Sequence, residues 1–229
     1  MTIGTLSEKS LHADLKSWYA LPDDDIEVVV DGYHIDIVRD ELLIEIQTAH
    51  FSAIKRKLRK LLPHRTIRLV YPIPLDRWIV RVDKNDKQIK RRKSPKHGRL
   101  DDLFDELVRI PALAAEPNLT IEVLFVQDEI VWKNDGKGSW RRKGWSLADR
   151  RLLSVLDSKL LKWPDSYLDF LPPSLPKRFT NKDLAKAAGA SIPRARKITY
   201  CLERMGLIDS IGHRDRYKVY TLIHRNDLA

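Results

Sequence analysis

The stretch that decides the fold is YHIDIVRDELLIEIQT, residues 33–48. Apolar and polar residues alternate on both sides of a short Arg-Asp-Glu turn, as in two half-buried strands joined as a hairpin. Asp36 lies between two isoleucines, and Glu45 and Gln47 share one face of the second strand. If the strands pair, Asp36 and Glu45 meet across the ladder. They are either a solvent-facing pair of acids or the hard oxygen ligands that a divalent ion needs for phosphodiester hydrolysis.

The segments around this stretch predict an α/β fold. Their order is helix, three strands, helix and strand, expected at residues 7–20, 26–30, 33–38, 42–47, 51–62 and 66–73. The Asp31-Gly32 pair is a tight-turn signal between the first two strands. An antiparallel meander followed by a helical crossover predicts a mixed sheet flanked by helices.

The middle of the chain predicts further elements of the same domain. A second hairpin is expected at 78–82 and 87–93, followed by a helix at 100–110 and a strand at 119–127. The polar, glycine-containing segment 133–145 is predicted to be a basic linker. The predicted organisation is a first domain at 1–132, a linker at 133–145 and a second domain at 146–229.

The last third has the element order of a small DNA-binding domain. A helix is expected at 146–161, and a proline-rich link leads to a short helix capped by Thr180. A second helix starts near Ile192–Pro193 and ends at Gly206, and residues 207–222 alternate like a two-stranded basic ribbon. Helix, short turn, helix and basic hairpin is the order of a winged helix-turn-helix, so the second domain is predicted to be mainly α.

The composition favours a polyanionic partner and a reducing compartment. Lys and Arg number 42 against 32 Asp and Glu, a formal net charge of +10, and the basic residues are interleaved with structural ones. The single cysteine, Cys201, excludes an intrachain disulfide and a four-cysteine metal site. No apolar run approaches the ~20 residues of a membrane span, and the N-terminus lacks a signal-peptide pattern. We therefore expect a cytoplasmic protein, bacterial or archaeal and nucleoid-associated, with no membrane contact.

The order of elements and the set Glu8, Asp36 and Glu45-x-Gln47 resemble the PD-(D/E)XK nuclease superfamily over about residues 5–75. The resemblance implies a restriction-endonuclease-like fold in which Asp36 and Glu45 bind Mg²⁺ or Mn²⁺. It also implies that Glu8 joins them as a supporting acid, directly or through water. The catalytic set implied by the resemblance is Glu8, Asp36, Glu45 and Gln47.

Gln47 departs from the superfamily, which usually has a lysine at this position. That lysine positions the attacking water and stabilises charge that develops on the phosphate. A glutamine supplies no charge but can orient a water or a scissile oxygen, and some restriction enzymes of the superfamily use Glu-x-Gln. Lys55 or Lys57 on the next helix is an alternative source of charge, unless both only form a basic helix face. His34 and His12 lie near the predicted site, and each has a contact interpretation and a structural one.

Basic residues beside serine, tryptophan or tyrosine predict nucleic-acid contacts. The predicted contact residues are Arg92, Lys93, Lys96, Arg141, Arg142, Lys143, Arg194, Arg196, Lys197, Tyr200, Arg214, Arg216 and Lys218. In a winged helix the second helix reaches the major groove, and the wing contacts the backbone or the minor groove. Trp140 or Trp145 provides a stacking platform in the linker, or else these tryptophans only pack on it.

We therefore predict a metal-dependent endonuclease that hydrolyses phosphodiester bonds in double-stranded DNA and is positioned by a winged helix. A homodimer or an accessory protein is compatible with the sequence. Two other classes remain as alternatives. One is a non-catalytic DNA-binding regulator with a decayed nuclease-like domain, and the other is an adaptor whose winged helix binds protein.

Overall fold

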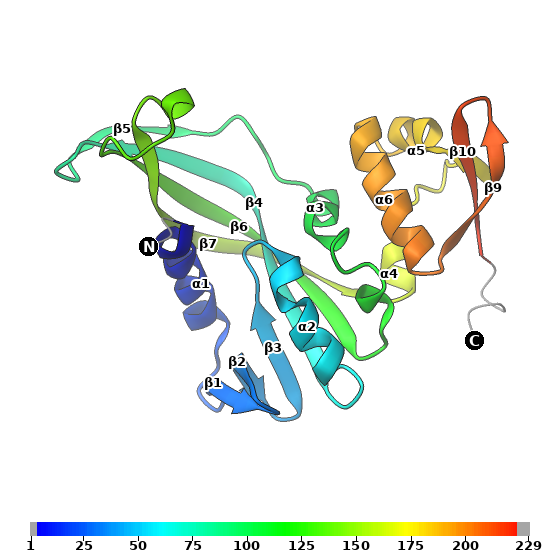
Figure 1. Ribbon diagram of the computed structural model, residues 1–229, viewed down its shortest axis with the longest axis horizontal. Helices are drawn as coiled ribbons and strands as arrows, with labels where there is room; N and C mark the ends of the chain where they lie inside the picture. The colour runs from blue at the N-terminus through cyan, green and yellow to red at the C-terminus, as the bar shows by residue number, and fades with distance from the viewer. Residues whose placement is uncertain (1–3, 224–229) are drawn as a thin grey trace. The chain divides into compact units, whose positions relative to one another are not determined.

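The computed structural model describes residues 4–223, with side chains from Ser10 onward (Figure 1). The chain divides into two compact units. The first holds the described residues up to Thr48 together with Val70–Leu100 and Glu122–Lys159; the second holds Ala49–Leu69, Asp101–Ile121 and the described residues from Leu160 on. In the described part of the chain, no helix is long and apolar enough to cross a membrane.

The N-terminal elements follow the predicted order. They are α1 (Gly4–Tyr19), β1 (Asp25–Val30), β2 (Tyr33–Arg39), β3 (Leu42–Ile46) and α2 (Phe51–Leu61). Asp31 and Gly32 both have positive φ, 49° and 80°, as the two-residue turn of a twisted hairpin requires. The strands β1, β2 and β3 pair antiparallel, so the predicted meander is confirmed.

The meander is part of a seven-stranded mixed sheet flanked by helices. Its strand order is β1-β2-β3-β4-β6-β7, with β5 paired to β4. The added strands are β4 (Thr66–Val82), β5 (Gln88–Lys93), β6 (Leu119–Asn134) and β7 (Trp145–Lys162). The predicted α/β class and the second hairpin are confirmed. Both β4 and β6 run much further than predicted.

The segment predicted as a helix at 100–110 is only partly helical. It forms a 3-10 helix (Leu100–Leu103) and the single-turn α3 (Phe104–Leu107). The backbone bonds that follow α3 join residues three apart, which is the tighter 3-10 pattern. Pro111, which has no N–H to donate, then ends the segment.

The helix predicted at 146–161 is wrong, because these residues form most of β7, which pairs with β6. Leucines three and four apart matched a helical stripe. In the structure Leu152 and Val155 pack against the core of the first unit, while Leu153 and Leu156 are exposed. Helix propensity differs by only tenths of a kcal/mol among such residues, so strand pairing outweighs it.

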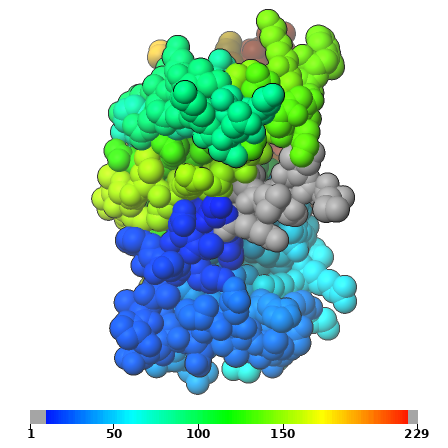
Figure 2. All heavy atoms as spheres, turned by 90° about the vertical axis from the view of Figure 1, so that its left-hand side faces the viewer, coloured from blue at the N-terminus to red at the C-terminus, as the bar shows by residue number. Residues whose placement is uncertain are grey.

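The core of the first unit lies between α1 and the sheet. Its buried residues are Leu11, Leu15, Tyr19, Ile37, Ile44, Ile46, Val70, Leu124 and Val126. The Leu152 N–H of β7 donates to Asp14 Oδ2 of α1 at 3.0 Å. Figure 2 shows the described part of α1 at the surface between the β1–β2 hairpin and β7. The apolar core and the bond to β7 therefore fix which side chains of α1 face the strands.

The second unit contains a compact C-terminal group of elements (Figure 1). After α4 (Asp165–Leu168) come β8 (Arg178–Thr180), α5 (Asn181–Ala187), α6 (Ile192–Arg204), β9 (Ile208–Arg214) and β10 (Tyr217–Leu222). The three strands form a separate sheet in the order β8-β10-β9. Thr180 and Ser191 cap α5 and α6 through their side-chain oxygens, so the predicted starts of both helices are confirmed.

A buried carboxylate ties three long strands together. Asp128 of β6 is fully buried and accepts hydrogen bonds from Arg77 of β4 at 2.7 and 2.6 Å. Arg150 of β7 donates its Nε–H to the Oδ2 atom of the same carboxylate at 2.8 Å. Buried charge is tolerated only when it is paired and hydrogen-bonded. This Asp128 triad therefore fixes the relative positions of β4, β6 and β7.

Loss of the Asp128 charge should destabilise the first unit strongly. Asp128→Asn leaves two partly buried guanidinium groups without a counter-charge, and we expect the free energy of unfolding to fall by about 3 kcal/mol. Urea unfolding followed by circular dichroism measures the change. Asp86→Asn removes an exposed ion pair with Lys133 and should cost less than about 1 kcal/mol. Equal losses in the two variants would contradict the role given to Asp128.

Candidate functional site

The predicted site lies at a fork between β2 and β3. These strands pair at Ile37–Ile44, Val38–Leu43 and Arg39–Leu42. Asp36 is the first residue beyond this ladder, and continuing the register by one residue places it opposite Glu45. The Oδ2 atom of Asp36 accepts a hydrogen bond of 2.8 Å from the backbone N–H of Ile46, the residue between Glu45 and Gln47. This hydrogen bond thus holds the Asp36 carboxylate beside the Glu-x-Gln segment.

The two predicted ligands differ in exposure. Glu45 is 2% exposed, whereas the side chain of Asp36 is 18% exposed. A carboxylate as buried as Glu45 needs hydrogen bonds or a cation to offset its lost hydration. Gln47 follows the end of β3, and its backbone N–H donates to Val70 O at 2.9 Å, which joins this edge to β4. One carboxylate is therefore enclosed, and the other can be reached by solvent.

α1 adds a histidine that the sequence interpretation left outside the catalytic set. His12 Nε2 lies 3.2 Å from Asp36 Oδ2, the oxygen that also accepts from Ile46 N. The hydrogen bond with Asp36 raises the pKa of His12 above its usual value, although burial and the charge of Lys16 oppose the rise. Its sequence signal was spacing: His12 lies four residues after Glu8 and four before Lys16, on one helix face.

Lys16 and Glu27 extend the site. The Lys16 ammonium contacts the Glu27 carboxylate, and the β1–β2 register places Glu27 opposite Asp36. The hydrogen bond from Lys16 lowers the pKa of Glu27, while the charge of Asp36 opposes this. Two basic side chains of α1 thus contact acids on β1 and β2. We call His12, Lys16, Glu27, Asp36 and Glu45 together the Asp36 fork.

The donor atoms of the Asp36 fork suit a hard divalent cation. Mg²⁺ prefers carboxylate oxygens, keeps several waters and is usually held by one or two protein carboxylates, which Asp36 and Glu45 supply. Among the side chains that the structure describes, no group of three or more His, Cys, Asp or Glu is placed to hold a metal ion. Glu8 lies on α1, but its side chain is outside the described residues, so its role stays a prediction.

Several residues considered from the sequence lie elsewhere. His34 is exposed on β2, and Lys55 and Lys57 lie on α2, which belongs to the second unit. Lys93 forms an ion pair of 2.9 Å with an aspartate of β4. Lys96 is exposed after β5. The contact interpretation of His34, the charge-supplying interpretation of Lys55 and Lys57, and the nucleic-acid interpretation of the last two residues remain predictions.

A second candidate site lies around the connection between β6 and β7. A pocket of about 590 Å³ is lined by Ile79, Arg81, Arg92, Trp132, Arg141, Arg142, Lys143 and Trp145. It brings together four predicted nucleic-acid contacts and one predicted stacking residue. Arg81 and Trp132 were missed, although Ile79 and Arg81 alternate on one strand and share a face. We call these eight residues the Arg–Trp pocket.

Arginines lie over both tryptophan rings of the Arg–Trp pocket. The Arg81 guanidinium is 5.1 Å from the ring centroid of Trp145, and that of Arg142 is 4.9 Å from the centroid of Trp132. Both distances are within the range of cation–π attraction. The pocket therefore combines flat aromatic faces with positive charge at its surface.

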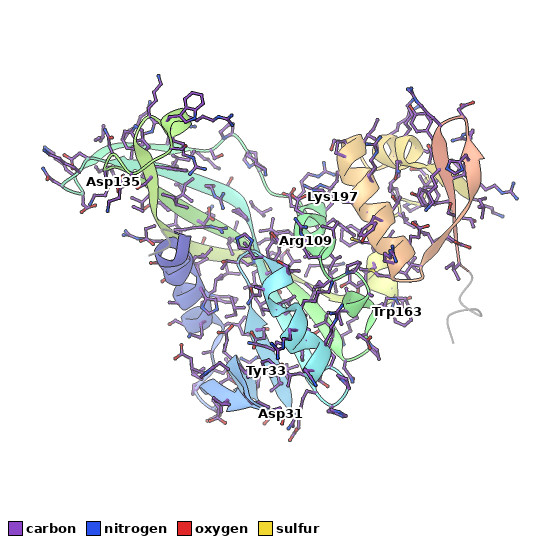
Figure 3. All side chains as sticks on the ribbon, in the orientation of Figure 1. Asp31, Tyr33, Arg109, Asp135, Trp163 and Lys197 are labelled. Atoms are coloured by element: carbon purple, nitrogen blue, oxygen red, sulfur yellow. The ribbon has the colours of Figure 1, made fainter. Side chains whose placement is uncertain are left out.

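Two basic residues predicted to read DNA from α6 are held by acids within the second unit. Arg194 donates to the Asp101 carbonyl at 2.6 Å and to the carboxylates of Asp102 and Asp105. Lys197 Nζ donates to Asp105 at 2.6 Å, and Figure 3 shows Lys197 on the side of α6 nearest α3. Burial raises the pKa of Asp105, but the two cations outweigh it and lower the pKa. We call Asp101, Asp102 and Asp105 the acidic turn.

The other predicted nucleic-acid contacts of the C-terminal group differ in whether a carboxylate of the protein pairs with them. Arg196 and Tyr200 are exposed on α6. On the β9–β10 ribbon, Arg214 pairs with an aspartate of α5, and Lys218 pairs with a glutamate of α6 at 2.6 Å. Arg216 donates to a neighbouring tyrosine hydroxyl at 3.2 Å. Among the described residues, Arg196 and Arg216 therefore keep charges that no carboxylate pairs.

Comparison with known proteins identifies relatives without an assigned activity. The family model described as "Domain of unknown function (DUF8091)" matches residues 9–162. An uncharacterised protein of Treponema pallidum (strain Nichols) is 30% identical over 221 residues, which cover 96% of this chain and 87% of the relative. No solved structure matches. The matched family segment contains both the Asp36 fork and the Arg–Trp pocket.

The bond between His12 and Asp36 should make stability depend on pH. Because the folded-state pKa of His12 is raised, its protonation stabilises the fold fully below the unfolded pKa of about 6.5, and this is lost as pH rises through the folded pKa. We expect His12→Gln to cost less stability at about pH 8.5 than at about pH 5.5. Urea unfolding in EDTA measures the cost.

The Asp36→Asn background is the matched control for this prediction. Without the Asp36 charge, the cost of His12→Gln should no longer fall with pH. A cost that is independent of pH in the wild-type background would contradict the assignment of the shift to Asp36.

Proposed function

We propose that the chain, which belongs to the DUF8091 family, is a metal-dependent endonuclease that hydrolyses phosphodiester bonds in DNA. The observation that carries this proposal is the hydrogen bond from Ile46 N to Asp36, which holds an aspartate beside Glu45-x-Gln47. Two strands part at this point, so both carboxylates stand on rigid elements, with Glu45 enclosed and Asp36 within reach of solvent. The order of elements around them resembles the PD-(D/E)XK nuclease superfamily.

Asp36, Glu45 and Lys16 of the Asp36 fork, with the neighbouring Gln47, have roles in this proposal. Asp36 and Glu45 would hold Mg²⁺ or Mn²⁺, which would polarise a phosphate oxygen and lower the pKa of a bound water. Gln47 would orient the attacking water through its amide. Lys16 of α1 is a candidate for the positive charge that Gln47 cannot supply, and Glu8 is retained as the supporting acid.

The C-terminal group supports a winged helix that binds double-stranded DNA. The chain order β8, α5, α6, β9, β10 and the strand order β8-β10-β9 are those expected of this motif. In the proposal α6 enters the major groove with Arg196 and Tyr200, and the β9–β10 ribbon contacts the backbone with Arg216. Arg194 and Lys197 take part only when they leave the acidic turn.

The proposal includes a cytoplasmic location and a protein partner. Cys201 is buried, and its burial raises the pKa of the thiol to about 12, so it is not poised as a nucleophile. One inert thiol fits a bacterial or archaeal cytoplasm, where the protein would be associated with the nucleoid. A homodimer or an accessory protein would add a second DNA contact.

One observation favours a second candidate, a non-catalytic DNA-binding regulator. His12 already contacts the oxygen of Asp36 that accepts from Ile46 N, and this link joins α1 to β2 and β3. A histidine–aspartate pair of this kind can serve the fold alone. In that case the protein binds DNA through its basic surfaces and cleaves nothing.

Cleavage separates the two candidates. With Mg²⁺ or Mn²⁺, the wild-type protein should cut plasmid, linear or branched DNA. Asp36→Ala and Glu45→Ala should each lower the rate by more than the roughly 100-fold upper range of outer-shell changes. Asp23→Ala, at an exposed acid before β1, should cut like the wild type. If the folded wild type cuts no substrate, and neither variant alters metal binding by calorimetry, the endonuclease proposal is wrong.

Charge reversal on α6 tests the winged helix. Arg196→Glu should weaken binding to duplex DNA about tenfold or more and lower the salt slope by about one, because one phosphate contact is lost. Arg204→Glu, an exposed position at the other end of α6, should have a much smaller effect. Fluorescence anisotropy against salt concentration measures both. Unchanged affinity in folded Arg196→Glu would favour the adaptor, in which this group binds protein.

A further inference from the structure

We propose that the Arg–Trp pocket binds one unpaired nucleotide of a nucleic-acid strand, so that the preferred substrate carries a single-stranded segment. This inference deepens the proposed function and rests on its nucleic-acid binding. It does not depend on catalysis at the Asp36 fork. All the residues of the pocket belong to the first unit.

The Arg–Trp pocket concentrates positive charge that the protein does not neutralise. Arg81, Arg92, Arg141, Arg142 and Lys143 line it, and within the described part of the chain none of the five forms an ion pair with a carboxylate. The arginines of the Asp128 triad and the cations at the acidic turn are paired instead. A phosphate would relieve the repulsion among the five cations and release its own counterions.

Two tryptophans give the pocket flat faces for a base. Trp132 on β6 and Trp145 at the start of β7 are both partly buried. Arg142 and Arg81 lie over their rings at 4.9 and 5.1 Å. Bases stack on indole rings and on guanidinium planes alike. The pocket therefore offers a plane for a base and cations for the attached phosphate.

The pocket is built on paired strands and a closed connection. One wall comes from β4 and β5, which pair antiparallel. The β6–β7 connection is closed by a hydrogen bond of 3.1 Å from Gly136 N to Gly144 O. A Cβ added to Gly138 would lie 2.1 Å from Trp145 O, so only glycine lets the chain approach this closely. Such pre-organisation lowers the cost of ordering side chains on binding.

The size of the pocket favours an unpaired nucleotide over a duplex. Its volume of about 590 Å³ lies within the roughly 300–1,000 Å³ of small-ligand sites. A base pair inside a double helix is already stacked on both faces and cannot present one base to the tryptophans. A free nucleotide has the same chemistry as a nucleotide within a strand, so the experiment must separate these two sources.

Binding in EDTA tests the pocket without cleavage. The full-length protein is titrated against a labelled single-stranded oligodeoxynucleotide of about 15 nucleotides, a length in the range of single-strand-binding folds. The same sequence is tested as a duplex, and dAMP and inorganic phosphate are tested as competitors. We expect the strand to bind at least about tenfold more tightly than either small ligand, because more phosphates contact the basic surface.

Variants inside and beside the pocket assign the binding. The double variant Arg81→Gln, Arg142→Gln and the single variant Trp132→Leu should each weaken single-strand binding about tenfold or more. Both should leave duplex binding unchanged. Trp132→Phe keeps an aromatic face and should retain most of the affinity. Lys137→Gln lies in the same connection outside the pocket lining and should bind like the wild type.

Three outcomes would overturn the inference. One is single-strand binding that stays at the wild-type level in pocket variants shown to be folded by circular dichroism. Another is an equal loss for single strand and duplex, and a third is dAMP binding as tight as that of the oligonucleotide. Failure of the proposed function looks different: no form cleaves DNA, yet the selective loss of single-strand binding in pocket variants persists and supports the inference.

Discussion

The hydrogen-bonded ion triad around the buried Asp128 carboxylate is the interaction on which the arrangement of the long strands β4, β6 and β7 depends. The carboxylate receives guanidinium groups from strands on both sides, and so holds β4, β6 and β7 where a partly exposed sheet would specify its register only weakly. The same three strands continue to the Arg–Trp pocket and supply four of its eight lining residues. The pocket therefore takes its geometry from an ion triad that does not line it.

Much of the N-terminal part of the chain could be predicted from residues 33–48 and their flanks. Alternation with a period of two, the positive-φ turn at Asp31-Gly32 and the amphipathic pattern of 51–62 are local signals, each decided by a few neighbouring residues. They were sufficient for the meander, for α2 and for the α/β class. The position of Asp36 beside Glu45 follows from the same alternation once the turn is known. The assignment to metal, DNA and cleavage concerns chemistry beyond the fold and remains a proposal.

The features that could not be predicted depend on residues far apart in the chain. Residues 145–162 carry leucines at helical spacing, and only pairing with β6 and the Arg150–Asp128 bond makes them a strand. His12 contacts Asp36 across 24 positions of the chain. The spacing of His12 indicates its helix face, but no local pattern indicates which strand residue it meets. Trp132 meets residues 141–143 in one pocket only because β6 and β7 are neighbours and the connection between them closes.

The acidic turn gives the second unit an internal competitor for any polyanion. Phosphates that reach Arg194 and Lys197 must displace carboxylates that already satisfy them. Exchanging one anion for another releases few counterions, and added salt weakens the internal pairs as well as the external ones. The salt dependence of this surface is therefore flatter than its number of basic residues implies. In a chain of net charge +10, the distribution of paired charge, more than its total, decides how selectively it attracts a polyanion.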